Sequence, residues 1–426
     1  MESILILGRQ PELGIAEAES LFGAGSVSPI FAGAPQTGHT NQSSQTKNNI
    51  PHAALLHIAA QDVRFEGLGG SLKLGTIIGH LDSNNWGEIE KSLAKIILKL
   101  VMDMPEGKVR LGLSVYGLPV RLDRLNATGL SLKKAVKAAG HSVRVVPNKE
   151  SNLNTAQVLH NQLNGPTGLE LLLIASGSKV LIARSVAVQD IEAYTKRDRG
   201  RPMRDAKVGM LPPKLAQIML NLGMGSKIDS STNTNTYSSA DTNTSARRLL
   251  DPFCGTGVVL QEAALMGHSV YGTDLEERMI RYSRDNLNWL QESHNINFDW
   301  FLEVADATSH LWQKPFDVVV CETYLGRPLA SVPDSGTLEK TVRYCNELHR
   351  KFLNNLAGQL PIGTRLCLAV PAWQLRPGVF KHLPVLDQIA QLGYNRLSFV
   401  HTGTRDLIYA RPDQVVAREL VILEKH

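Results

Sequence analysis

The feature that most constrains this chain is the alternation of short apolar strands with amphipathic helices after residue 247. Segments such as "RRLLDPF", "SVYGTD" and "FDVVVCE" have the length and composition of buried strands, and helical patterns such as "LEERMIRYSRDNLNWL" separate them. Strands that alternate with helices form a parallel sheet covered on both faces. We therefore predict a doubly wound α/β domain over residues 247–426, with a C-terminal hairpin around Pro412 and Asp413 at the sheet edge.

The first half of the chain also mixes strands and helices, in smaller units. Residues 1–106 predict a small α/β sandwich, and residues 107–190 predict a second α/β segment that ends in the hairpin "LELLLIASGSKVLIARSV". Residues 191–225 predict a basic junction followed by a helix that precedes the sheet. Two polar stretches without apolar periodicity, 32–50 and 226–246, predict mobile loops.

Positive charge is concentrated in the junction. The 426 residues carry a net charge of only +5, but the stretch from Lys196 to Lys214 has seven basic side chains against two acidic ones. Such a stretch suits contacts with phosphates, although it also fits a solvated loop. The basic residues of the junction are Lys196, Arg197, Arg199, Arg201, Arg204, Lys207 and Lys214.

Cysteine usage and the N-terminus indicate a compartment. The four cysteines form no C-x-x-C pair and the histidines form no metal-binding pattern, so we expect no metal site. Scattered cysteines in a long chain fit a reducing cytosol. The N-terminus does not resemble a signal peptide, and no apolar run is long enough to span a membrane. We therefore expect a cytoplasmic protein.

The stretch "LLDPFCGTGVVL" is a strand, a glycine turn and a helix start. Gly255 and Gly257 allow positive φ and close backbone approach. Asp274 and Asp306 end the next two predicted strands, where carboxylates can accept hydrogen bonds from a ribose and an adenine amino group. A dinucleotide fingerprint would need a glycine at Leu260, and a phosphate loop would need a lysine after the glycines. The pattern favours S-adenosylmethionine.

A second candidate site is "CETYLG", after the strand "FDVVV". Enzymes that methylate exocyclic amines commonly have Asp-Pro-Pro-Tyr at this place, where the acid accepts an N–H, the prolines stiffen the loop and the aromatic ring stacks on the base. Here Glu322 replaces the Asp, Thr323 and Tyr324 replace the prolines, and Leu325 replaces the aromatic. We predict Glu322 as the acceptor and Tyr324 as a stacking partner.

The sequence resembles the THUMP-domain tRNA guanine-N2 methyltransferases. "LLDPFCGTG" is similar to their cofactor motif, "LGGSLKLG" to their ferredoxin-like domain, and "AYTKRDRGRPMRDAKVGMLPPKLAQIML" to their junction. The resemblance implies an N-terminal ferredoxin-like domain (1–106, with the insertion 32–50), a THUMP domain (107–190) and a Rossmann-like class I methyltransferase domain (247–426).

The resemblance further implies tRNA as the substrate and methyl transfer to the exocyclic amine of a guanosine, at position 10 in the family. It implies tRNA contacts by the junction residues Lys196, Arg197, Arg199, Arg201 and Arg204. The predicted cofactor-binding residues are Lys214, Asp251, Phe253, Gly255, Gly257, Asp274, Leu275, Asp306 and Ala307.

Two other functions remain open, the first of them because the "ETYLG" loop departs from the family pattern. One is a tRNA-binding homologue with weakened or lost catalysis, and the other is a DNA amino-methyltransferase, which uses the same chemistry. Some relatives of this fold work with a small zinc-binding activator protein, and the sequence leaves open whether this chain does.

Overall fold

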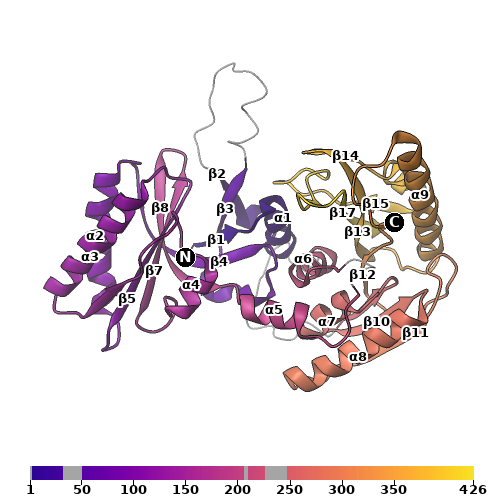
Figure 1. Ribbon diagram of the computed structural model, residues 1–426, viewed down its shortest axis with the longest axis horizontal. Helices are drawn as coiled ribbons and strands as arrows, with labels where there is room; N and C mark the ends of the chain where they lie inside the picture. Colours follow the sequence, from indigo (N-terminus) through magenta and orange to yellow (C-terminus); the bar gives the residue numbers. More distant parts are fainter. Residues whose placement is uncertain (1, 32–49, 206–209, 226–246, 314) are drawn as a thin grey trace, which may run out of the picture. The chain divides into compact units, whose positions relative to one another are not determined.

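The computed structural model of the protein describes residues 2–31, 50–205, 210–225, 247–313 and 315–426. These residues divide into two compact units (Figure 1). The first contains residues 1–15, 24–66 and 70–191, and the second contains 16–23, 67–69 and 192–426. Apart from Ile50, the two predicted polar loops lie outside the described residues.

The first unit is built on one mixed sheet of eight strands. In spatial order the strands are β2 (Val27–Phe31), β3 (Pro51–Leu56), β1 (Ser3–Leu7), β4 (Ser71–Leu81), β8 (Lys179–Val188), β7 (Gly168–Ser176), β5 (Val109–Tyr116) and β6 (Val143–Val145). The hairpin of β7 and β8 is the one that the sequence predicts. Neither β2 nor β4 is predicted as a strand from the sequence.

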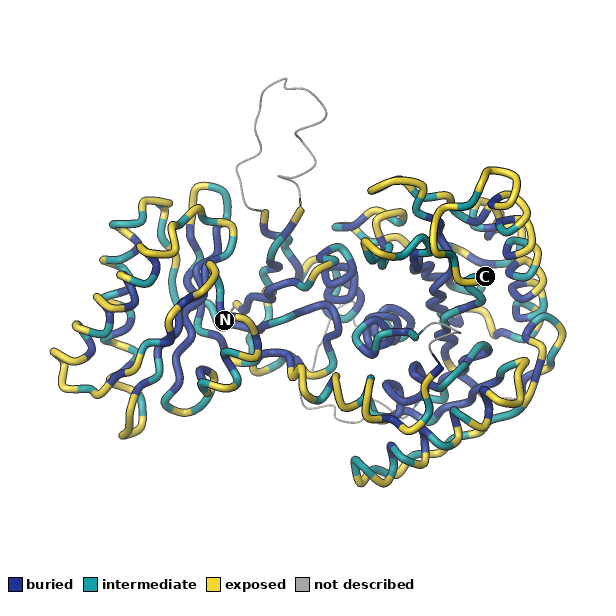
Figure 2. The backbone as a smooth tube through the Cα atoms, viewed as in Figure 1, coloured by how far each residue is buried: buried dark blue, intermediate teal, exposed yellow. Residues whose placement is uncertain are grey.

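Two long helices cover one face of this sheet. Their apolar sides form a core with β5 and β7, and the dark strands in Figure 2 show how fully the centre of the sheet is buried. A shorter helix begins at Asn154, which forms a capping box with Gln157. Short 3₁₀ turns complete the unit. The helices are α2 (Trp86–Met102), α3 (Leu122–Ala138) and α4 (Thr155–His160), and the turns are η1 (Ala24–Ser26), η2 (Ala60–Asp62) and η3 (Phe65–Gly67).

The second unit is the predicted doubly wound domain. The main path of its sheet has the order β11 (Trp300–Val304), β10 (Ser269–Asp274), β9 (Arg248–Asp251), β12 (Val318–Glu322), β13 (Arg365–Arg376), β17 (Val416–Lys425) and β15 (Tyr394–Arg396). The first five of these strands are parallel to one another, and β17 is antiparallel to both β13 and β15. Two short strands, β14 (Val379–Lys381) and β16 (Ile408–Tyr409), pair with β13 and β17.

Helices cover both faces of this sheet, which confirms the predicted fold class. α6 (Pro213–Met224), α7 (Val258–Leu265) and α8 (Glu277–His294) form one layer, and α5 (Ile191–Arg199) precedes them. α9 (Ser335–Ala357) and the 3₁₀ helix η4 (Pro384–Leu392) pack on the other side. The remaining helix, α1 (Pro11–Phe22), has its last residues in this unit.

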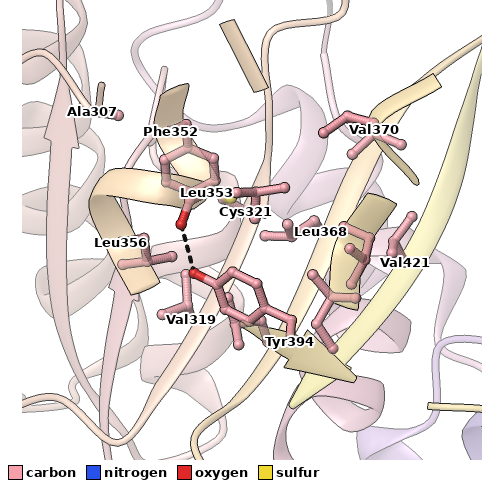
Figure 3. Close-up of a cluster of buried hydrophobic side chains, with 14 of the residues drawn as sticks. Ala307, Val319, Cys321, Phe352, Leu353, Leu356, Leu368, Val370, Tyr394 and Val421 are labelled. Atoms are coloured by element: carbon pink, nitrogen blue, oxygen red, sulfur yellow. Dashed lines mark hydrogen bonds between the residues drawn. The ribbon is translucent and has the colours of Figure 1, made fainter. Parts of the chain in front are cut away.

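The core under α9 fixes the position of the second candidate site. Cys321, the residue before Glu322, is fully buried among Phe352, Leu368 and their neighbours (Figure 3). The Tyr394 hydroxyl donates to the Leu353 carbonyl at 2.9 Å, so β15 is tied to α9. The end of β12 is therefore held by packing on a rigid helix.

The place of one predicted element is wrong. The C-terminal hairpin exists, because β16 pairs antiparallel with β17, but it was expected at the sheet edge and β17 lies between β13 and β15. The reason is its composition: Arg418 to Leu423 are buried without alternation, which is typical of a strand covered on both faces. The predicted boundaries at residues 106, 190, 225 and 246 stay predictions.

Candidate active site

Adjacent parallel strands bring the predicted cofactor residues to one edge of the sheet. Asp251 ends β9, Asp274 ends β10, and Asp306 follows β11. Gly272 of β10 lies opposite Asp251, and Asp274 lies opposite Val304 of β11. The carboxyl ends of these strands therefore meet at the edge where α/β sheets bind ligands.

The turn between β9 and α7 requires glycine. Gly255 has φ of +52° and Gly257 has φ of +80°, and a Cβ at Gly257 would lie 2.9 Å from Ser283 Oγ. Ser283 donates to the Gly255 carbonyl at 2.8 Å, and Asn286 Nδ2 donates to the Thr256 carbonyl at 2.8 Å. These two side chains of α8 hold the turn, and the sequence analysis did not identify them.

Asp274 is fixed by two backbone amides. Its Oδ2 accepts from Gly255 N at 2.9 Å and its Oδ1 accepts from Glu276 N at 2.9 Å. Burial raises the pKa of Asp274, and these hydrogen bonds oppose that rise because they favour the charged form. Leu275, the next predicted cofactor residue, is 69% exposed, so its side chain is open to a ligand.

Asp251 and Phe253 face the interior. Burial raises the pKa of Asp251 well above its usual value, and the nearby charges of Asp274 and Glu322 raise it further. Asp251 accepts from Phe253 N at 3.1 Å, and the Phe253 ring packs edge-on against Phe352 with centroids 4.9 Å apart. Both residues therefore shape the turn from inside. Glu322 ends β12, which pairs in parallel with β9, so its carboxylate lies at the same edge of the sheet.

Asp306 is exposed after β11. Its Oδ1 accepts from both the amide and the hydroxyl of Thr308, at 2.9 and 2.7 Å. Ala307 beside it is buried. The Asp306 carboxylate is thus oriented by a local turn at the same edge of the sheet as Asp274.

These residues fit S-adenosylmethionine. The close-approach turn at Gly257 has no room for a side chain, and the fixed carboxylate of Asp274 stands at the next strand end, where it can accept from ribose hydroxyls. Leu275 offers an exposed apolar surface beside it. The residues that would hold the cofactor are therefore Gly255, Gly257, Asp274, Leu275 and Asp306.

Glu322 ends β12, next to β9, and is engaged in an ion pair. Its Oε1 accepts from Nε of Arg418, a residue of β17 that lies 96 positions later in the chain. The Arg418 side chain is 6% exposed and that of Glu322 is 17% exposed. The carboxylate is therefore held from within the protein while part of it remains open.

Thr323 anchors the loop that follows. His349 is fully buried on α9, and its Nδ1 donates to the Cys345 carbonyl at 2.7 Å. Its Nε2 must then accept the Thr323 hydroxyl proton, across 2.6 Å. Burial lowers the pKa of His349 to about 4, so the ring stays neutral. Gly326 completes the turn with φ of +88°.

The aromatic residue of the loop has a partner. Tyr324 is half-buried and lies edge-to-face with Tyr344 of α9, with centroids 6.1 Å apart. Tyr344 is 63% exposed. Burial raises the pKa of Tyr324, so its hydroxyl remains protonated near neutral pH. The exposed aromatic surface beside the loop thus comes from Tyr324 and Tyr344, while Leu325 offers none.

The five predicted tRNA-binding residues differ in their surroundings. Lys196, Arg199 and Arg204 are exposed, as phosphate contacts require. Arg197 donates from Nε to Glu262 at 2.7 Å, and Arg201 is only 3% exposed. A buried or ion-paired guanidinium is not presented to a phosphate, so the predicted role does not fit these two. Lys207 of the same stretch lies outside the described residues.

Lys214, predicted to meet the cofactor carboxylate, lies in the first turn of α6. Its ammonium is 5.0 Å from the centroid of the Tyr194 ring, and burial lowers its pKa. The ring of Tyr194 also lies 4.4 Å from the Arg197 guanidinium. Lys214 is thus held in a cation–π cluster at the start of this helix.

Comparison with known proteins agrees with this site. A family model described as "Methyltransferase domain" matches residues 243–367, the part that contains the glycine turn, Asp274, Asp306 and Glu322. This part of the chain is similar to methyltransferase domains. The match agrees with the predicted cofactor, because the residues that fit S-adenosylmethionine lie within it.

Two curated relatives confirm the resemblance to tRNA guanine-N2 methyltransferases. Each is a tRNA (guanine(10)-N2)-dimethyltransferase. That of Methanothermobacter thermautotrophicus is 30% identical over 194 residues, 45% of this chain and 48% of the relative. That of Pyrococcus abyssi is 30% identical over 165 residues, 38% of this chain and 39% of the relative. The matched region thus spans less than half the length of these relatives.

Solved structures are more distant. TrmN from Thermus thermophilus is 16% identical over the whole of both chains, with a TM-score of 0.49. A predicted N6-adenine-specific DNA methylase from Listeria monocytogenes is 11% identical over 98% of this chain and 95% of that protein, with a TM-score of 0.42.

Proposed function

We propose that this protein is an S-adenosylmethionine-dependent tRNA methyltransferase that modifies the exocyclic N2 amine of a guanosine, at position 10 as in the relatives' names. The observation that carries the proposal is the arrangement at one sheet edge. The glycine turn follows β9, Asp274 ends β10 and Glu322 ends β12, and both β10 and β12 pair in parallel with β9. A methyl donor and a fixed acceptor for an amine can therefore meet at this edge of the sheet.

The chemistry requires little from the protein beyond positioning. When bound, S-adenosylmethionine supplies a methyl group on a sulfonium and leaves as the thioether. Glu322 accepts a hydrogen bond from one N–H of the guanine amine, which helps the nitrogen lone pair leave conjugation with the ring. The nitrogen gains the methyl carbon and gives up one proton, which Glu322 passes to water. Tyr324 supports the base by stacking.

The exposed basic residues Lys196, Arg199 and Arg204 suit the tRNA backbone. Free, buried cysteines agree with a reducing compartment, so a cytoplasmic location belongs to the proposal. None of the described helices is long and apolar enough to cross a membrane. In the described residues, no group of three or more His, Cys, Asp or Glu side chains could hold a metal ion.

The test is methyl transfer to bulk tRNA from labelled cofactor, followed by digestion to nucleosides. We expect labelled N2-methylguanosine or its dimethyl form, and mapping of the modified nucleotide tests position 10. Glu322→Ala should lower turnover by about 100-fold or more and leave the affinity for S-adenosylhomocysteine unchanged. Folded protein that yields no labelled methylguanosine from any tRNA pool would contradict the proposal.

A tRNA-binding protein without catalysis is the second candidate, and the Arg418–Glu322 ion pair is the observation that favours it. A carboxylate neutralised by arginine can be a structural element in place of a catalytic one. This candidate predicts tRNA binding without turnover. Calorimetry with S-adenosylhomocysteine adds a second distinction, because a protein that kept only its RNA surface need not bind the cofactor product. A DNA amino-methyltransferase would instead methylate duplex DNA in the same assay.

A further inference from the structure

Arg418 is a buried cation with one clear partner. It lies in β17, opposite Pro371 of β13 and Tyr409 of β16, and its residue is 5% exposed. Its Nε donates to Glu322 Oε1. A guanidinium at this depth must have a carboxylate partner, and Glu322 is that partner.

The neighbouring charged residue of β17, Glu419, has partners of its own. Glu419 is 1% exposed, and it accepts from Arg396 Nη2 at 2.8 Å and bonds His382 Nδ1 at 2.6 Å. Because successive side chains of a strand point to opposite faces, Arg418 and Glu419 serve different sides of the sheet. Arg418 is therefore not required to neutralise Glu419, and its function concerns Glu322.

The ion pair contributes orientation more than stability. Removing a guanidinium and a carboxylate from water offsets much of their mutual attraction, so a pair at this depth adds little net free energy of folding. What it does provide is a fixed direction for the carboxylate. With Oε1 held by Arg418, Oε2 is the oxygen left for a substrate N–H.

The Glu322 side chain needs such a restraint more than the aspartate of the Asp-Pro-Pro-Tyr loop does. Glutamate has one more rotatable bond than aspartate, and Thr323 and Tyr324 replace the two stiffening prolines. An unrestrained Glu side chain would lose about 1.5–2 kcal/mol of conformational entropy on reaching one orientation. The Thr323–His349 hydrogen bond restrains the loop after Glu322, but it does not restrain the Glu322 side chain.

We propose that Arg418 is a positioning residue that presents Glu322 Oε2 to the amine of the substrate, an inference that rests on the proposed methyl transfer. Arg418 touches no reacting atom itself. It supplies from β17 the rigidity that the prolines give in the common form of the loop.

The test compares single and double variants at saturating tRNA and over a range of cofactor concentrations. Arg418→Gln should lower kcat by about 10- to 100-fold with the KM for cofactor unchanged, because a misplaced acceptor slows the chemical step. Arg418→Lys should recover part of that loss, since a cation can still reach Glu322. In a Glu322→Gln background, Arg418→Gln should cause no further loss, because the two residues act as one unit.

The matched control is Arg396→Gln, which removes the corresponding partner of Glu419 on the other face of the same strand. It should lower the melting temperature without lowering kcat per folded molecule. Equal kcat losses in Arg396→Gln and Arg418→Gln, or independent losses in the double variant, would overturn the inference while leaving the proposed function intact. A wild-type protein that transfers no methyl group would instead overturn the proposed function, and the inference with it.

Discussion

Arg197 and Arg199 lie two positions apart in the same helix, but one is part of a buried ion pair and the other is exposed. Arg197 is 11% exposed and pairs with Glu262, whose pKa is raised by burial to about 7. Arg199 is exposed. Because that pKa lies near 7, loss of Arg197 would let the Glu262 carboxyl take up a proton and stay buried with a lost hydrogen bond, whereas loss of an exposed cation leaves only solvent.

Arg197→Met should therefore destabilise the protein by about 1–3 kcal/mol, whereas Arg199→Met should change stability by less than about 0.5 kcal/mol. Urea unfolding of the two variants measures the difference. In filter binding across a salt series, Arg199→Met should weaken tRNA binding and reduce the salt slope by about one. Equal stability losses in the two variants would contradict the assignment of Arg197 as structural.

His349 makes the folded protein sensitive to acid. The unfolded chain binds a proton at this position below the usual histidine pKa of 6.5, but the buried ring does not until pH falls to about 4. Stability from this residue is therefore complete above pH 6.5 and is lost as pH falls toward 4, by about 3 kcal/mol in all.

The measurement is the difference in unfolding free energy between about pH 7 and about pH 5, for wild type and for His349→Gln. The variant should lose less stability on acidification than wild type, because it has no ring to protonate. His141→Gln, at a residue that is not buried, serves as the control and should keep the wild-type pH dependence. An unchanged pH dependence in His349→Gln would contradict the assignment.

For single residues of the site, the sequence predicts features that depend on neighbours along the chain. The glycine turn and the acids at strand ends follow from residue type and spacing, and the structure has them at one sheet edge. Arg418 could not be predicted, because it reaches Glu322 across 96 positions through the order of the strands. His349 lies four residues after Cys345 on an apolar helix face, but only the packing of α9 shows that it meets Thr323.

Among the elements, the β9–α7 turn is the one on which cofactor binding depends. Gly257 combines a positive φ with a close approach to Ser283, whereas Gly267 has φ of +90° and open space around its Cβ position. Gly267→Ala should lower stability only by the strain of placing a residue with a side chain in the left-handed conformation, roughly 1–2 kcal/mol. Gly257→Ala adds a steric clash inside the turn.

We therefore expect Gly257→Ala to lower the affinity for S-adenosylhomocysteine by about 10-fold or more, and Gly267→Ala to leave it unchanged. Calorimetry measures both affinities, and thermal melts show whether each variant is folded. Equal affinities in the two variants would indicate that the turn does not approach the cofactor.

The strand–helix order of this unit could be predicted because each element has its own periodicity. The place of β17 could not, since a continuous apolar run fits an edge hairpin or a central strand until its neighbours are known. Its insertion between β13 and β15 is also what carries Arg418 to the end of β12. The place of β17 inside the sheet is therefore the reason that Arg418 meets Glu322.

For the whole molecule, the second compact unit is not continuous in sequence. It includes residues 16–23, from the helix near the N-terminus, together with 67–69 and 192–426. Glu19 accepts from the backbone amides of Val400 and His401 at 2.6 and 3.0 Å. Ser20 donates to the Asn221 carbonyl at 3.0 Å. Sequence periodicity cannot reveal that residues 16–23 belong to the second unit, because it describes only neighbours along the chain.

The loop around Val400 should depend on Glu19. Hydrogen bonds from backbone amides to a charged carboxylate contribute about 1.5–3 kcal/mol. Glu19→Gln removes the charge and keeps the shape, so we expect the amides of Val400 and His401 to exchange hydrogen faster, as measured by mass spectrometry on a peptide that covers them. Glu12→Gln, in the first turn of the same helix and outside this unit, is the matched control and should leave their exchange unchanged.

The fragment 192–426, which lacks Glu19 and Ser20 altogether, should show the same faster exchange together with a lower melting temperature. If the fragment melted like the full chain, with Val400 fully protected, residues 16–23 would not be part of the unit that carries the proposed active site.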